Sequence, residues 1–182
     1  VHDPEIRRAF DRIGWISVGQ TPDIMEMQRT LYYQLTAEQL EPKPGVTAEV
    51  QLDTLKTACV GKQWLVVLDD VWDSAHEKML NCIDVNTTSK LFVTTRIRGL
   101  LKGCDEISLN LMTPSESVDL LLRTGAVEDP SDTAAAVAAA QIADLCGHLP
   151  LYLSICGGII ADFEDDATWH TELAGMLKED RV

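Results

Sequence analysis

Residues 64–68 read Trp-Leu-Val-Val-Leu, an unbroken apolar run between Lys62-Gln63 and the acid pair Asp69-Asp70. A continuous apolar run, as opposed to an alternating one, is typical of a strand that is covered on both faces. Such strands lie in the interior of parallel sheets. The segment therefore predicts the central strand of an α/β domain.

Three other segments are predicted strands. Residues 14–18 (Gly-Trp-Ile-Ser-Val) are rich in β-branched and aromatic side chains, and residues 90–94 (Lys-Leu-Phe-Val-Thr) form another strand. Residues 106–109 alternate polar and apolar side chains, which favours a shorter strand nearer an edge. A helix is expected at 96–101. Strands that alternate with helices predict a parallel sheet with right-handed crossovers.

Capping residues indicate where the helices between the strands begin. The pair Thr21-Pro22 predicts the start of the first of them, because Thr is a good N-cap and Pro suits the first helical position. We expect Thr47 to begin the next helix. Asp73 or Ser74 is expected to cap a short helix after the central strand.

The pattern of the chain changes at Thr113, after which no strand is predicted. Thr113 and Glu116 match a capping box around Pro114. An Ala-rich helix is expected at 133–146. Pro150 begins a nearly all-apolar helix, and we expect such a helix to be buried. The sequence therefore predicts an α/β domain followed by a small all-α domain, with bounds 1–112 and 113–182.

Composition limits the class of partner. The 182 residues carry a formal net charge of −14, which argues against nucleic acid and against an anionic membrane surface. No apolar run reaches membrane-spanning length. The five cysteines form no CxxC pair, a pattern typical of reduced core thiols in a cytoplasmic protein.

Polar side chains follow two of the predicted strands. Asp69 and Asp70 end the central strand, where parallel sheets bind ligands; a carboxylate there could hold a magnesium ion through water, or both acids could cap the next helix. Thr94, Thr95 and Arg96 end the third strand. The Arg96 side chain could reach a terminal phosphate, or it could form a salt bridge to one of the two acids.

A third constellation lies at residues 146–151, Cys-Gly-His-Leu-Pro-Leu. It predicts a helix end, a tight turn and a helix start. The flat ring of Pro150 could press against a planar base, or the segment could be only a connector. We expect His148 to be exposed or locally bonded.

Five segments together resemble the NB-ARC family, the STAND-class P-loop ATPases of plant resistance proteins and animal apoptosis activators. Residues 62–73 (KQWLVVLDDVWD) resemble its Walker B segment and residues 90–96 (KLFVTTR) its sensor-one segment. Residues 147–151 (GHLPL) match its GLPL motif. Residues 12–20 (RIGWISVGQ) and 109–117 (LNLMTPSES) resemble the strand after the first helix and the entry to the first helical domain.

The resemblance implies a three-layer P-loop NTPase-type domain that binds ADP or ATP with Mg²⁺ and switches a signalling protein. It implies that Asp69 holds the magnesium ion through water. Asp70 stands where related ATPases carry a catalytic Glu, and its shorter side chain suits slow hydrolysis. The resemblance also implies that Thr95 and Arg96 bind nucleotide, with Arg96 sensing the γ-phosphate.

The same resemblance implies that Pro150 and Leu151 contact the adenine and close an ARC1-like helical domain on bound ADP. It implies protein partners or self-association for the parent protein. No GxxxxGK[ST] phosphate-binding loop occurs among the 182 residues. We therefore expect a piece truncated after that loop, with slow ATPase activity in the parent and none in the piece itself.

Two alternatives remain. The chain could be a degenerate module that mediates protein contacts and binds no nucleotide. It could also be a phosphoacceptor receiver domain, but that fold needs a Lys after its last strand, where Asn110 stands here. The all-α part would also be unexplained.

Overall fold

The computed structural model describes residues 3–127, 133–163, 169, 172–173 and 175. By its internal contacts the chain divides into two compact units, Val1–Glu106 and Ile107–Val182. The division falls slightly ahead of the expected boundary at residue 112.

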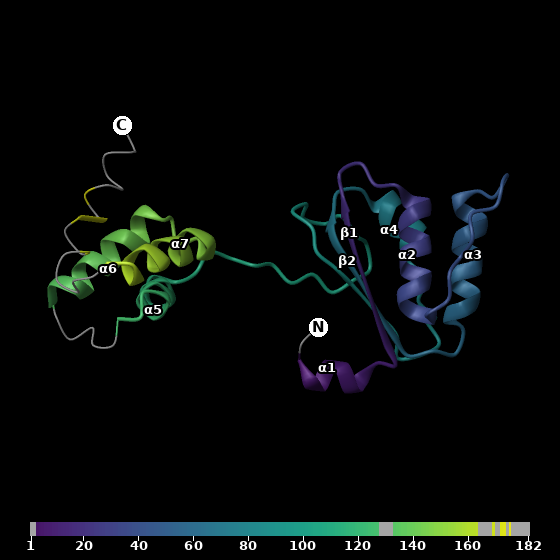
Figure 1. The fold of residues 1–182 in the computed structure, drawn as a ribbon, viewed down its shortest axis with the longest axis horizontal. Helices are drawn as coiled ribbons and strands as arrows, with labels where there is room; N and C mark the ends of the chain where they lie inside the picture. The colour runs from purple at the N-terminus through teal and green to yellow at the C-terminus, as the bar shows by residue number, and fades with distance from the viewer. Residues whose placement is uncertain (1–2, 128–132, 164–168, 170–171, 174, 176–182) are drawn as a thin grey trace. The chain divides into compact units, whose positions relative to one another are not determined.

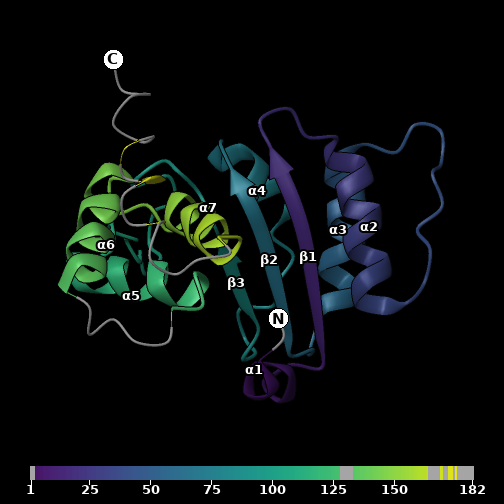
Figure 2. The ribbon, with the colours of Figure 1, turned by 60° about the vertical axis from the view of Figure 1, so that its left-hand side comes forward.

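A three-stranded parallel sheet forms the centre of the first unit (Figures 1 and 2). Its strands are β1 (Arg12–Gly19), β2 (Trp64–Val71) and β3 (Lys90–Val93), in the order β1-β2-β3. The prediction of a central strand is confirmed, because β2 pairs with both neighbours and both Val66 and Leu68 are completely buried. Since the strands are parallel, their carboxyl ends meet at one edge of the sheet.

Four helices of the first unit lie within the described residues: α1 (Pro4–Ala9), α2 (Ile24–Thr36), α3 (Ala48–Cys59) and α4 (Ser74–Leu80). Helices α2 and α3 lie side by side next to the sheet (Figure 2). Their apolar sides share one core with the strands, which includes Leu31, Leu35, Leu52, Leu55, Trp64, Val66 and Leu68.

The predicted caps of two helices are confirmed. Thr47 is the N-cap of α3, and Asp73 is the N-cap of α4. The predicted start of α2 at Thr21 is wrong, because its N-cap is Asp23. The carboxylate of Asp23 accepts a hydrogen bond from the Glu26 amide at 3.0 Å, and a negative charge is favourable at the amino end of a helix.

The side chain of Gln34, on α2, covers the outer edge of β1. Its Oε1 accepts the backbone N–H of Trp15 at 2.6 Å, and its Nε2 donates to the Trp15 carbonyl at 3.1 Å. Because β1 is an edge strand of the described sheet, this amide satisfies backbone groups that another strand would otherwise pair.

Two predicted elements are wrong. Residues 94–113 contain neither helix nor strand, so the helix expected at 96–101 and the strand expected at 106–109 are absent. Gly99 has a φ of 65°, a left-handed conformation that interrupts a helix. A strand requires hydrogen bonds to a neighbouring strand, and no described segment pairs with residues 106–109.

The second unit contains α5 (Pro114–Thr124), α6 (Thr133–Leu145) and α7 (Pro150–Ala161). The predicted capping box at the start of α5 is confirmed: the Glu116 amide donates to Thr113 Oγ1 at 3.3 Å, and the Thr113 amide donates to Glu116 Oε2 at 2.8 Å. The backbone hydrogen bond from Thr113 holds the pKa of the Glu116 carboxyl below its usual value. Both bonds define where α5 begins.

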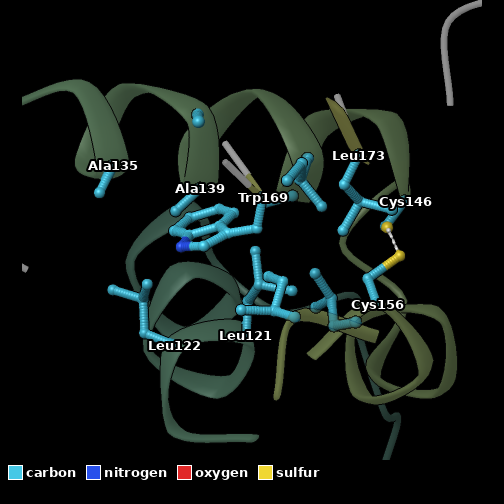
Figure 3. Close-up of a cluster of buried hydrophobic side chains, with 13 residues drawn as sticks. Leu121, Leu122, Ala135, Ala139, Cys146, Cys156, Trp169 and Leu173 are labelled. Carbon is cyan, nitrogen blue, oxygen red and sulfur yellow. Dashed lines mark hydrogen bonds between the residues drawn. The ribbon is translucent and has the colours of Figure 1, made fainter. Parts of the chain in front are cut away.

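The core of the second unit surrounds Trp169, whose side chain is almost completely buried (Figure 3). It packs in one cluster with Leu121 and Leu122 of α5 and with Ala139 of α6. The cluster also includes Ala135, Ala138, Ile142, Ala143, Cys146, Leu153, Cys156, Ile160 and Leu173.

The prediction that the helix from Pro150 is buried is correct for only one side of that helix. Leu153 and Ile160 of α7 are buried, but Leu151 and Ile155 are 69% and 52% exposed. A helix packed against a small helical unit buries one side, and within this unit the other side of α7 remains uncovered.

Helices α5 and α7 approach each other closely at Gly157. A Cβ atom on Gly157 would lie 1.8 Å from the hydroxyl oxygen of Thr124 and 3.0 Å from the carbonyl oxygen of Leu121. A Cβ atom on the next residue, Gly158, would have no other atom within 4 Å. The contact between α5 and α7 therefore requires glycine at position 157 but not at position 158.

We expect Gly157→Ala to lower the free energy of unfolding of the helical unit by about 2 kcal/mol, because the added methyl group forces α5 and α7 apart. The matched variant Gly158→Ala should be neutral or should raise this free energy by up to about 1 kcal/mol, since Ala favours helix. Urea denaturation followed by far-UV circular dichroism measures both. Equal effects of the two variants would contradict the close approach.

Candidate functional site

A pocket of about 440 Å³ lies at the carboxyl ends of the three strands. The structure brings four of the predicted site residues to it: Asp69 and Asp70 from β2, and Thr95 and Arg96 from the segment after β3. Its lining is completed by Ser17 and Thr94. The pocket therefore places two carboxylates, three hydroxyl groups and one guanidinium around the same space.

The hydroxyl group of Thr94 joins the ends of β2 and β3. It donates to Asp69 Oδ1 at 2.6 Å and accepts the backbone N–H of Asp70 at 2.9 Å. The Thr94 backbone adds two bonds, from its amide to the Leu68 carbonyl at 3.0 Å and from the Val71 amide to its carbonyl at 2.9 Å. These four bonds fix the position of both acids relative to the third strand.

Asp70 has an unusual backbone conformation for a residue inside a strand, with a φ of 56°. Asp tolerates the left-handed region better than most residues do, because its short side chain bonds locally. The side chain of Asp70 is 35% exposed. The acid is thus neither buried in the sheet nor fully solvated.

Arg96 lies against one residue near the end of β2 and one residue just after it. Its Nε is 3.5 Å from Asp70 Oδ1, and its guanidinium carbon lies over the Trp72 ring at 5.6 Å from the ring centroid. The ion pair that the sequence left open is therefore present, and its partner is Asp70. Because the Arg96 side chain is 76% exposed, this pair contributes little to stability and leaves a cation available to an anionic ligand.

The pocket suits a magnesium ion that takes most of its ligands from outside the protein. Asp69 uses one carboxylate oxygen for Thr94, and its other oxygen has no hydrogen bond within the described part of the chain. No group of three or more His, Cys, Asp or Glu side chains that could hold a metal ion occurs among the described residues. A Mg²⁺ ion bound by one or two carboxylates, phosphate oxygens and water fits this donor set.

Sequence reasoning missed three residues around the pocket. Ser17 lies opposite Asp69 in the parallel register of β1 and β2, so strand alignment would have located it. The sequence shows Thr94 at the end of the third strand but gives no sign of its hydrogen bonds. Trp72 belongs to the segment that resembles a Walker B motif, but its contact with Arg96 depends on the left-handed conformation of Asp70, which the sequence does not reveal.

The segment at residues 146–151 belongs to the second unit. His148 is locally bonded, as expected: its Nδ1 lies 3.0 Å from Ser117 Oγ, and its Nε2 lies 3.3 Å from Asp144 Oδ1. Pro150 is the first residue of α7 and, like Leu151, is exposed. The roles of Pro150 and Leu151 at an adenine stay predictions.

The structure also bears on the predicted state of the cysteines and on the search for a membrane-spanning segment. No disulfide is present in the described residues, and four of the five cysteines are buried; Cys104 is exposed. In the same part of the chain, no helix combines the length and the apolar character needed to cross a bilayer.

Comparison with known proteins shows the family of this chain. It is 26% identical over 181 residues to a putative late blight resistance protein homolog of Solanum demissum, and 29% identical over 181 residues to homolog R1B-16 of the same species; each match covers 96% of this chain and 14% of the relative. A late blight resistance protein of that species is 28% identical over 131 residues, which is 69% of this chain and 10% of the relative. The NB-ARC domain family matches residues 1–130, and the chain therefore belongs to the NB-ARC family.

Proposed function

We propose that this chain is part of an ADP/ATP switch, in which the pocket at the strand ends binds the magnesium ion and the terminal phosphate. Because the chain belongs to the NB-ARC family, whose domains bind nucleotide, nucleotide binding is the general function expected of it. The observation that carries the finer proposal is the meeting of Asp69, Asp70 and Arg96 at one pocket. Carboxylates beside a cation, at the carboxyl edge of a parallel sheet, suit a magnesium–phosphate group.

In this proposal each side chain has a distinct role. Asp69 would hold the magnesium ion through water, and the ion, when bound, would supply positive charge beside the phosphate oxygens. Asp70 accepts a proton from the attacking water. Arg96 donates its N–H groups to the terminal phosphate, with the hydroxyl group of Thr95 beside it.

The second unit would supply the adenine contacts. Pro150 and Leu151 are exposed at the start of α7, where an apolar surface suits a planar base. We propose that bound ADP holds the two units closed through these residues.

A nucleotide shifts a conformational equilibrium only by its difference in affinity for the two states. ADP and ATP differ by one phosphate group. Among the groups around the pocket, Arg96 is the cation that can distinguish them. We therefore propose that Arg96 detects the additional phosphate group of ATP and that Pro150 holds the units closed on ADP.

The phosphate-binding loop is not part of these 182 residues, since no GxxxxGK[ST] motif occurs in them. We propose that the loop belongs to another part of a longer protein, and that this protein acts in the cytoplasm. We also propose that it acts in disease resistance, which is the role that the names of the relatives give to those proteins. The chain spans only 14% of the length of those relatives. By itself the chain should bind ADP weakly and turn over no ATP.

A second candidate function is a protein-interaction module that binds no nucleotide. The uncovered apolar side chains of α7 favour it, because Leu151, Tyr152 and Ile155 are each more than half exposed and apolar surface of this kind marks contact sites. Nucleotide binding distinguishes the two candidates.

We expect a chain extended at its amino end to include a phosphate-binding loop to bind ADP with Mg²⁺ in isothermal titration calorimetry. Asp69→Asn should weaken this magnesium-dependent binding about tenfold or more, because a carboxylate that holds the ion through water acts through its negative charge. The same change at Asp53, an exposed acid on α3, should leave binding unchanged. Absence of ADP binding to the extended wild-type chain would reject the switch and favour the interaction module.

Asp70→Asn, in the same extended chain, should keep ADP affinity within about twofold and should slow ATP turnover about 100-fold, the usual contribution of a general base. A phosphate-release assay under single-turnover conditions measures the rate. Turnover that persists at the wild-type rate in this variant would show that Asp70 is not the base.

A further inference from the structure

Trp72 is the aromatic residue that contacts the candidate phosphate sensor. Its ring lies under the Arg96 guanidinium, with 5.6 Å between the guanidinium carbon and the ring centroid. A separation below about 6 Å is within the range of cation–π attraction. Among the described residues this is the one such contact, and it is at the edge of the site.

The backbone on both sides of Trp72 is fixed. Before it, the Val71 carbonyl accepts the Thr95 hydroxyl at 2.7 Å, and the Val71 amide donates to the Thr94 carbonyl at 2.9 Å. After it, Asp73 accepts the Ala75 amide at 2.8 Å as the cap of α4. The Trp72 ring nitrogen is itself buried, with no hydrogen-bond partner among the described residues. The backbone that carries the ring is therefore fixed by hydrogen bonds on both sides, and the nitrogen edge of the ring is buried.

The two contacts of Arg96 differ in kind. Cation–π attraction acts on the positive charge of the guanidinium and uses none of its N–H groups as hydrogen-bond donors, so these groups stay available to an oxygen ligand. The Asp70 carboxylate binds on the Nε side, at 3.5 Å. A phosphate would compete with Asp70 for the N–H groups, but it would not compete with Trp72.

We infer that Trp72 is a positioning residue for Arg96. Its ring keeps the guanidinium beside the pocket while the N–H groups exchange between the Asp70 carboxylate and a terminal phosphate. Without the ring, a side chain that is 76% exposed would sample many rotamers and would lose entropy on binding. The inference has two parts. The ordering of Arg96 by Trp72 does not depend on the proposed function, whereas its consequence, a preference for ATP over ADP, rests on that function.

The ordering of Arg96 is tested in the chain without any nucleotide. In ¹⁵N relaxation measurements, the Arg96 Nε–H order parameter should fall below about 0.6, the flexible range, when Trp72 is changed to Leu. The matched control is Trp15→Leu, since Trp15 is a half-exposed residue of β1 with no cation over its ring in the described structure. That control should leave the Arg96 value unchanged, and Trp72→Phe, which keeps an aromatic face, should give an intermediate value. An Arg96 order parameter that is equal in wild type and in both Trp72 variants would overturn the inference.

The consequence is tested in the extended chain with a phosphate-binding loop. Trp72→Leu should weaken binding of a non-hydrolysable ATP analogue about three- to tenfold, the range expected for loss of a cation–π contact, and should change ADP affinity less than twofold. In an Arg96→Ala background the same change should have no effect on either. A merely structural role of Trp72 would weaken both nucleotides equally and would persist without Arg96, which would contradict the inference. If neither nucleotide binds the wild-type chain while Trp72→Leu mobilises Arg96, the proposed function fails and the positioning role stands.

Discussion

The site depends on one hydroxyl group. Thr94 donates to the Asp69 carboxylate and accepts from the Asp70 amide, so its hydroxyl group links the Asp69 side chain and the Asp70 backbone to the segment after β3. The parallel register brings these ends to the same edge of the sheet, but register alone does not orient side chains. The Thr94 bonds orient Asp69, and the left-handed turn at Asp70 places the second acid where Arg96 meets it.

Much of the first unit could be predicted because its strands satisfy local rules. The apolar run at 64–68 indicated a strand covered on both faces, and β2 is the middle strand. Strands β1 and β3 overlap the segments predicted at 14–18 and 90–94. The strand expected at 106–109 failed for a non-local reason: alternation shows that a segment suits an edge strand, but a strand exists only where a neighbour pairs with it. Likewise, the apolar composition of α7 indicated burial, but composition does not reveal how many elements are present to cover a helix.

The site was predictable to the extent that parallel topology determines it. Carboxyl ends of neighbouring parallel strands must lie together, which is why Asp69, Asp70, Thr95 and Arg96 meet at one pocket. The contact between Arg96 and Trp72 could not be predicted, because it depends on the left-handed backbone conformation at Asp70 and on the rotamer of an exposed side chain. Pro150 and Leu151 belong to the other unit, and their proposed contact with adenine does not follow from the topology of the sheet.

The amide of Gln34 has a consequence for how this sheet can grow. A side-chain amide bonded to both polar groups of Trp15 occupies the place of an incoming peptide in the middle of β1, so another polypeptide can dock on that border only after α2 releases it. The opposite border, at β3, has no such cover within the described residues. Any additional strand, whether from the same polypeptide or from another molecule, would therefore add beside β3 and would end next to the pocket that Thr94 lines.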